Sequence, residues 1–400
     1  MRLLCLLCLA LLPAAAYSYN QNHSRYHLID ASFQHQAPAL FAIETRWQDG
    51  DETLNQFRIK RLVSLKPHVR YHQPILMVAP FNATLEQYAL TSSGNYQDSF
   101  EAQLALAGFD VWIIEDRIFT GDPADCDGLV DCSVMGTWGL GLRNQDIEFA
   151  RSLLQHATHE NRPIIGGTTG GGMAAIAAIN ANPDHYRALF STGGLYSADE
   201  EIRAHNQLSC DNFRTEISEG ILYRDALGGL DVLIAAARDY PEEISAVDPS
   251  VSNYQFIVNI LTGSGALGFL AFTPSYRFAA PNETLDDYKY MNAEVFYQDT
   301  QTFGKLVSHS HFADIKCSIA GERTFTGHLD QFKGNVLFLG GGSSMAPLEI
   351  DNAKLFTQAV VQVIVDPTDG GEADNYLVDY SFREEVLDQP LINWLQQQYD

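Results

Sequence analysis

The stretch Pro163-Ile-Ile-Gly-Gly-Thr-Thr-Gly-Gly-Gly-Met-Ala-Ala-Ile-Ala-Ala-Ile179 decides the fold. A short β-branched run enters a group of glycines, and an alanine-rich run with helical propensity leaves it. This order predicts a strand, a sharp turn and a helix. The better register of the turn is Gly167-Thr-Thr-Gly-Gly171, centred on Thr169. A register one residue earlier, centred on Thr168, is the alternative.

Apolar runs on both sides of this turn predict an α/β architecture. Ile75–Ala79 and Phe109–Glu115 are nearly continuous apolar runs, which are typical of buried parallel strands. Strands that alternate with helices indicate a mostly parallel sheet with right-handed crossovers. Further strands are expected at 186–191, 335–340 and 360–365, and helices at 100–107, 146–154, 351–357 and 382–397. Alternating runs at 27–30, 40–47 and 57–63 predict antiparallel strands at the start of the sheet.

Residues 197–332 interrupt this alternation, and we call them the cap segment. Their pattern is mainly helical, as at Val232–Arg238 and Phe256–Leu261. We expect a helical cap inserted into a core made of residues 17–196 and 333–400. The Gly-rich apolar run Leu261–Ala271 is expected to pack inside the cap, with pocket lining as the alternative.

Residues 1–16 have the pattern of a secretory signal peptide. One arginine precedes an apolar run, and small residues follow, so that cleavage is expected after Ala14 or Ala16. The apolar run is shorter than the roughly 20 residues that a membrane span needs. We therefore expect an exported mature chain, periplasmic or extracellular, without a transmembrane segment.

Four cysteines remain after removal of the signal, and an even number in an exported chain indicates disulfides. Cys126 and Cys132 bracket a short loop and are the natural local pair, which leaves Cys210 for Cys317. The second bond would tie the two ends of the cap segment together. Zinc binding by the four cysteines is not expected, because no C-x-x-C spacing occurs.

The charge balance excludes one class of partner. The chain has 50 acidic and 25 basic residues, which gives a formal net charge of -25. Binding to nucleic acid needs a basic surface to contact phosphates, so no nucleic-acid partner is expected. Electrostatic docking on anionic membranes is disfavoured for the same reason.

Several segments together resemble the α/β-hydrolase family, in particular capped lipase-type and esterase-type members. They cover most of the mature chain and occur in the family's order: 74–78, 107–114, 145–148, the glycine-rich turn, 378–380 and 390–395. The resemblance implies an α/β-hydrolase fold and a catalytic triad of nucleophile, acid and histidine, in that chain order. In such a triad the histidine takes the proton of the nucleophile while the acid orients the imidazole.

All three triad positions that the resemblance implies are altered here. Thr169 stands at the nucleophile position, where a β-branched residue is disfavoured at positive φ. Ser343 stands where an aspartate is expected, and Leu377 stands where the histidine is expected. Asp199 or Glu200 is an alternative source of the acid.

The ligand pocket of the resembling family lies around the turn after the first buried strand and around the glycine-rich turn. Here the first turn reads Ala79-Pro80-Phe81, where family members commonly have His-Gly, and proline has no N–H to offer an oxyanion. Pocket-lining candidates are Pro80, Phe81, Thr168, Thr169, Gly170 and Asp116. Asp116 is included because it follows a strand at its carboxyl end, the usual ligand side of open α/β sheets.

No metal or cofactor is expected. His309, His311 and Asp314 have metal-ligand residue types, and alternation along a strand would point both imidazoles one way. A lone H-x-H is more often a pair of surface or capping histidines, and we interpret it so. The loop Gly340–Ser344 lacks the lysine and the spacing of a phosphate-binding loop.

Taken together, these residues predict an exported, capped α/β-hydrolase-like protein that does not catalyse hydrolysis. It would bind a small apolar or ester-like ligand, or a protein partner, between cap and sheet. The alternative is an active lipase-type or esterase-type hydrolase that uses Thr169 as nucleophile with a non-standard base.

Overall fold

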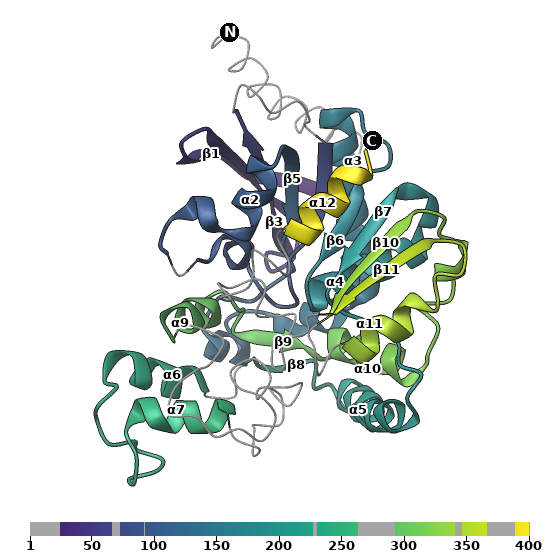
Figure 1. Cartoon of the computed structure of the whole chain (residues 1–400). Helices are drawn as coiled ribbons and strands as arrows, with labels where there is room; N and C mark the ends of the chain where they lie inside the picture. The colour runs from purple at the N-terminus through teal and green to yellow at the C-terminus, as the bar shows by residue number, and fades with distance from the viewer. Residues whose placement is uncertain are drawn as a thin grey trace.

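The computed structural model describes residues 25–65, 73–91, 93–226, 230–262, 293–340, 346–365 and 389–399. Its main sheet has nine strands in the order β1-β2-β3-β5-β4-β6-β7-β10-β11 (Figure 1). The strands are β1 (Tyr26–Ala37), β2 (Leu40–Asp49), β3 (Gln56–Ser64), β4 (Gln73–Val78), β5 (Phe109–Ile114), β6 (Ile164–Gly167), β7 (Ala188–Ser191), β10 (Asn335–Gly340) and β11 (Val360–Val365).

The sheet combines an antiparallel and a parallel part. β1, β2, β3 and β5 pair antiparallel, and Gly50 supplies a positive φ of 66° in the turn between β2 and β3. From β5 through β4, β6, β7 and β10 to β11 every pairing is parallel. The parallel strands therefore end at one edge of the sheet, and β4 and β6 lie side by side there.

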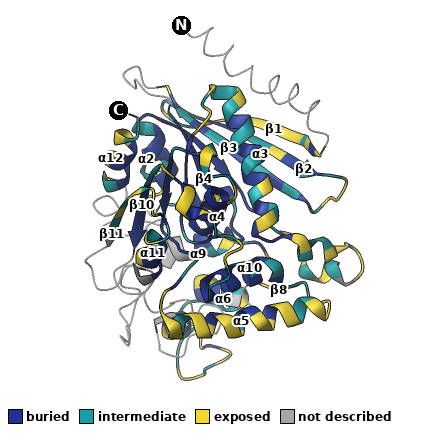
Figure 2. Cartoon of the chain, turned by 90° about the vertical axis from the view of Figure 1, so that its right-hand side faces the viewer, coloured by how far each residue is buried: buried dark blue, intermediate teal, exposed yellow. Residues whose placement is uncertain are grey.

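Helices cover both faces of the sheet and make two cores. On one face α2 (Phe100–Leu106) and α12 (Gln389–Gln397) pack against the strands, and on the other α3 (Leu140–Thr158), α4 (Gly170–Ala181) and α11 (Ala346–Ala353) do so. Figure 2 shows α4 as mostly buried, and its residues from Gly170 to Asn180 are all buried, whereas β1 is largely exposed. Because α4 is apolar on all sides, it fits only a position enclosed by sheet and neighbouring helices.

The described part of the cap segment contributes no strand to the main sheet. Its described elements are α5 (Glu200–Ser218), β8 (Tyr223–Asp225), α6 (Leu230–Asp239), α7 (Asn253–Thr262), α9 (Ala293–Gln301), β9 (Leu306–Ser308) and α10 (His309–Ala320). β8 and β9 form a separate antiparallel pair. Short 3-10 turns lie at Leu85–Ala89, Tyr96–Asp98, Pro123–Asp127, Cys132–Thr137, Pro183–His185 and Leu329–Gln331.

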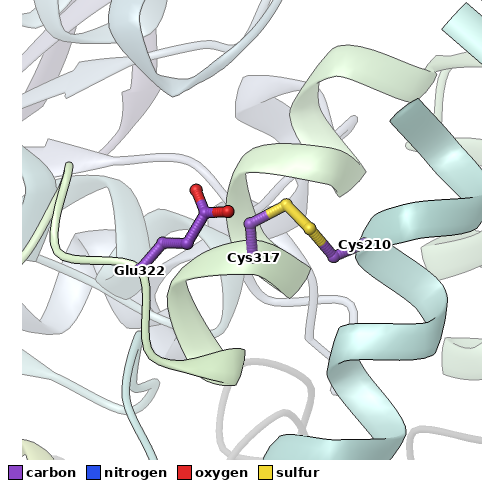
Figure 3. A group of neighbouring side chains, drawn as sticks. All are labelled: Cys210, Cys317 and Glu322. Carbon is purple, nitrogen blue, oxygen red and sulfur yellow. A yellow bond between two sulfur atoms is a disulfide. The ribbon is translucent and has the colours of Figure 1, made fainter.

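Both expected disulfides are present. Cys126 and Cys132 are joined, and Cys210 on α5 is joined to Cys317 on α10. Figure 3 shows the second bond between the two helices, with the Glu322 side chain beside it. Glu322 accepts two hydrogen bonds from the guanidinium of Arg214, at 2.6 and 2.8 Å, which adds a surface link between the same two parts of the chain.

The structure corrects several boundaries. α3 begins at Leu140 rather than at residue 146, and α11 spans Ala346–Ala353 rather than 351–357. His309 and His311 lie on helix α10 and not on a strand, because Ser308 at the N-cap accepts the N–H of His311 and starts a helix there. The signal at 1–16, the run 263–271, and residues 382–388 lie outside the described residues. Among the described helices, none is long and apolar enough to cross a membrane.

We expect the Cys210–Cys317 bond to stabilise the protein more than the Cys126–Cys132 bond. The first closes a sequence separation of 107 residues and the second one of 6. In the chain-entropy account, these loops correspond to about 5 and about 2 kcal/mol of unfolding free energy. The double variants Cys210→Ser/Cys317→Ser and Cys126→Ser/Cys132→Ser, compared by urea denaturation, measure the difference. Equal losses in the two variants would contradict this ranking.

Candidate functional site

At the glycine-rich turn, the backbone at the start of α4 packs directly against the backbone at the end of β4. A Cβ on Gly171 would lie 2.1 Å from the carbonyl oxygen of Val78, and one on Gly167 would lie 2.7 Å from the same oxygen. A Cβ on Gly172 would lie 2.3 Å from Oγ of Ser191. These glycines allow the first turn of α4 to lie directly against the ends of β4 and β7.

Thr169 occupies the tip of this turn. It has φ 43° and ψ -121°, a sparsely populated region for a β-branched residue, and it is the N-cap of α4. Its N–H donates to Oγ1 of Thr192 at 3.0 Å, and its carbonyl accepts the N–H of Met173 at 2.9 Å. The side chain of Thr169 is half-buried, so the strained residue is the one that reaches toward solvent.

Thr168 faces the opposite way. It is fully buried, and its N–H and Oγ1 lie 3.3 and 3.4 Å from the hydroxyl of Tyr88. That hydroxyl also donates to the carbonyl of Val78 at 2.8 Å, and burial raises the pKa of Tyr88 to about 12. Tyr88 is therefore a neutral donor, and Thr168 belongs to the interior.

The turn after β4 lies against the start of α4. A Cβ on Gly170 would lie 2.4 Å from Cβ of Phe81 and 2.8 Å from its backbone nitrogen. Within the described ranges, no hydrogen bond uses the N–H of Phe81 or that of Gly170. Two backbone donors thus flank Thr169, although Pro80 itself supplies none.

Buried charge holds this turn in place. The carboxylate of Asp116 accepts the N–H of Asn82 at 3.0 Å and the N–H of Arg117 at 2.9 Å, and it forms an ion pair with Arg143. Arg143, in the first turn of α3, also donates to the carbonyl of Ala79. Asp116 is 7% exposed, so these contacts occupy a carboxylate that was expected to line the pocket.

The cap segment holds the other side of the same turn. Asn82 has a positive φ of 54° and donates from its side chain to the carbonyl of Gly304 at 3.0 Å. Its own carbonyl accepts the N–H of Gly304 at 2.9 Å, and the N–H of Thr84 donates to Thr302 at 2.8 Å. Asn82 and Thr169 are two of the four non-glycine residues with positive φ in the described ranges, and both lie here. Residues in sparsely populated backbone conformations cluster at functional sites, which supports this turn as the candidate site.

His311 lies against this turn and not on the surface. Its ring is 4.0 Å from the ring of Phe81, and both His309 and His311 are 2% exposed. Burial lowers the pKa of His311 to about 3, so its imidazole is neutral at physiological pH. The expectation of surface or capping histidines is therefore wrong, because α10 turns this face toward the core.

An aromatic cluster joins the turn to the cap segment. The ring of Phe81 packs on that of Phe312 at 4.9 Å, and Phe312 stacks on Phe213 of α5 at 5.3 Å. Ala226 and Val307 belong to the same apolar cluster. We call Phe81, Phe213 and Phe312 the aromatic cluster.

The remaining predicted residues are distributed as follows. Ser343 and Leu377 lie outside the described residues. Asp199 is the N-cap of α5, where its carboxylate accepts the N–H groups of Glu201 and Ile202 at 2.8 and 3.0 Å. In the part of the chain that is described, the one cluster with metal-ligand spacing is Cys210, Cys317 and Glu322, and the disulfide occupies both sulfurs.

Solved structures with the same arrangement exist. A candidate lipase from Sulfolobus solfataricus superposes with a TM-score of 0.63 at 14% identity, covering 94% of this chain and 100% of that one. A hypothetical protein from Pseudomonas aeruginosa superposes with a TM-score of 0.51 at 11% identity, covering 91% and 96%. No family model and no curated protein matches the sequence. At this identity the likeness concerns the fold alone.

We expect Gly171→Ala to lower the free energy of unfolding by about 3 kcal/mol, because the added methyl overlaps a backbone carbonyl that cannot rotate away. The matched control is Gly141→Ala on α3, where a Cβ meets nothing within 4 Å. There we expect a gain of about 0.5–1 kcal/mol from helix propensity. Thermal unfolding of both variants checks the pair, and a Gly171→Ala protein as stable as the parent would contradict the packing.

The burial of His311 predicts that the folded protein loses stability in acid. Its pKa is about 3 in the folded protein and near 6.5 when unfolded, so below pH 6.5 only the unfolded chain takes up this proton. The free energy of unfolding should fall from pH 6.5 toward pH 3, by at most about 1.4 kcal/mol per pH unit from this residue. His311→Phe should flatten that slope in urea titrations, whereas the exposed His27→Gln should leave it unchanged. An unaltered slope in His311→Phe would refute the assignment.

Proposed function

The chain has the α/β-hydrolase fold, and from that premise we propose that it binds a small apolar or ester-like ligand without hydrolysing it. One observation carries the proposal. In the described ranges, Thr169 hydrogen-bonds through its backbone to Thr192 and Met173, and no imidazole or carboxylate contacts its hydroxyl. A threonine hydroxyl needs an adjacent base to become a nucleophile.

The residues around Thr169 support ligand binding. The half-buried side chains of Phe81 and Thr169 lie at the carboxyl edge of the parallel strands, next to the aromatic cluster. Apolar and aromatic walls with a few fixed polar groups are typical of small-molecule sites. The backbone donors of Phe81 and Gly170 suit the carbonyl oxygen of an ester-like group.

The proposal includes export. The two disulfides support it, because such bonds persist in oxidising compartments outside the cytosol. The signal-like pattern of residues 1–16 supports it from the sequence.

A second candidate is an active hydrolase with Thr169 as nucleophile. The backbone of Thr169 supports it, since a strained turn with φ 43° before a helix is the kind of turn that carries the nucleophile in this fold. The two flanking N–H groups would stabilise the oxyanion that forms during acyl transfer.

Labelling with a fluorophosphonate probe separates the two candidates. We expect no covalent adduct on Thr169 by intact-protein mass spectrometry and no turnover of short-chain or long-chain nitrophenyl esters. Thr169→Ser, which removes the methyl group but adds no base, should remain equally inert. Turnover and labelling that vanish in Thr169→Ala and survive in Thr168→Ala would establish the hydrolase instead.

Native mass spectrometry of the purified protein tests ligand binding itself. A co-purifying lipid-like mass that is lost in Phe81→Asp would support the binding function. A chain free of small molecules that forms a tight complex with another protein would instead favour a role in protein interaction.

A further inference from the structure

β1 is an edge strand of the main sheet, and within the described residues it pairs with β2 alone. Its register with β2 is regular from Asp30 to His35, and a register shift interrupts the pairing on each side of this run, which we call the edge run. Phe33 is 53% exposed, and Figure 2 shows β1 exposed along most of its length. An exposed strand edge offers backbone donors and acceptors to another strand.

Hydrogen bonds at the ends of β2 decide which residues of the edge run bond to it. Alternate residues of a strand bond to the neighbour on one side. The N–H of Leu65 donates to the carbonyl oxygen of Ala39 at 2.8 Å and extends the β2–β3 ladder, so the odd-numbered residues of β2 bond to β3. The N–H of Gly50 donates to the carbonyl oxygen of Arg25 at 2.8 Å, which agrees that the even-numbered residues bond to β1. The residues of the edge run opposite these even-numbered positions are Asp30, Ser32 and Gln34.

The backbone groups of Ala31, Phe33 and His35 therefore point away from the sheet. A separate contact agrees with this orientation, because the N–H of Ala31 donates to the carboxylate of the neighbouring Asp30 at 2.8 Å. The edge run thus presents backbone donors and acceptors at alternate residues, in the arrangement that an antiparallel partner strand needs.

The composition of β1 does not protect this edge. Natural edge strands are commonly shielded by lysine, proline or other charged residues. β1 contains no lysine, arginine or proline, and Asp30 is its one acidic residue. The whole chain has a formal net charge of -25, so two copies repel each other at most relative orientations. The weakly charged edge run is a place where they can approach with little repulsion.

We propose that two copies of this chain associate through their edge runs, antiparallel about a twofold axis at Ser32, so that the two main sheets join into one. In this register Ala31 of each copy lies opposite Phe33 of the other, and each such pair exchanges two backbone hydrogen bonds. The new bond to the N–H of Ala31 releases the carboxylate of Asp30.

The side chains of the edge run complement each other in this register. Asp30 of one copy lies opposite Gln34 of the other. The side-chain oxygen of Gln34 accepts a hydrogen bond from Gln36 at 2.7 Å, which leaves the side-chain N–H groups of Gln34 to donate to the carboxylate. On the other face of the strand the small side chain of Ala31 leaves room for the ring of Phe33.

The proposed contact does not involve the candidate site. β2, β3 and β5 separate β1 from β4, and the turn that carries Phe81 follows β4. The inference therefore does not rest on the proposed binding of a ligand.

Sedimentation equilibrium of the disulfide-intact protein over a range of concentrations tests the association. We expect an equilibrium between monomer and dimer with no larger species, because a twofold contact is closed. The dimer should become tighter as sodium chloride increases from about 0.05 to about 0.5 M, because salt screens the repulsion between two acidic molecules. A monomer at every concentration and salt level overturns the proposal, and so does an open series of larger oligomers.

Variants locate the contact. Phe33→Lys should weaken the dimer by about tenfold or more, because it places a solvated charge on the pairing edge. The matched control is Val360→Lys, which adds the same charge at a residue that is 72% exposed on the opposite edge strand, β11, and should leave the dimer unchanged. Ala31→Pro removes an N–H that points away from β2, so it should weaken the dimer while circular dichroism shows the parent fold. Should Ala31→Pro not fold, the comparison of the two lysine variants decides.

Crosslinking tests the register. Residues that face each other in a pair without mutual hydrogen bonds have Cα atoms about 4.5 Å apart, which a disulfide can span. Ser32→Cys should therefore form a disulfide-linked dimer under mild oxidation, and Val360→Cys should not, as seen by non-reducing electrophoresis. A dimer that is as tight in Phe33→Lys as in the parent, or that links through Val360→Cys and not through Ser32→Cys, overturns the proposal.

Discussion

The constraint on which the site depends is the contact between the first turn of α4 and the end of β4. The carbonyl oxygen of Val78 leaves no room for a side chain at Gly167 or Gly171. Because the helix starts so close to the strand, the connecting residue Thr169 must take a positive φ, and the Phe81 backbone comes to lie against Gly170. One backbone contact thus determines the position of the half-buried hydroxyl, of two N–H donors and of an aromatic ring.

Buried charge has a structural role next to this contact. Asp116 and Arg143 hold the turn after β4, and Arg117 bridges Asp49 and Asp146, all of them nearly inaccessible to solvent. Further hydrogen bonds support each pair: Asp116 accepts the N–H groups of Asn82 and Arg117, and Asp146 accepts the hydroxyl of Tyr26. The acids of this chain are therefore not only a solvated surface, since several of them fix the strands and turns that carry the candidate site.

Much of the fold followed from local sequence signals, whereas the site did not. The apolar runs that became β4, β5, β10 and β11 and the glycine-rich turn were predictable, because strand burial and glycine clustering are visible within a few residues. The burial of Asp116 was missed because its partner Arg143 lies 27 positions away. The first turn of α3 was missed as well, so Arg143 was not placed near the sheet. His311 was misjudged because an H-x-H pattern fits a strand as well as a helix, and the N-cap at Ser308 decided the matter.

The bond between α5 and α10 has a consequence for how the molecule withstands proteases. Cys210 and Cys317 turn the intervening chain into a covalent ring anchored on two adjacent helices. A single backbone cut anywhere inside that ring leaves both fragments attached through sulfur, each still seated on its own helix. The part of the cap segment within the ring can thus be nicked without the molecule coming apart, a tolerance that an uncrosslinked insertion of the same length would lack.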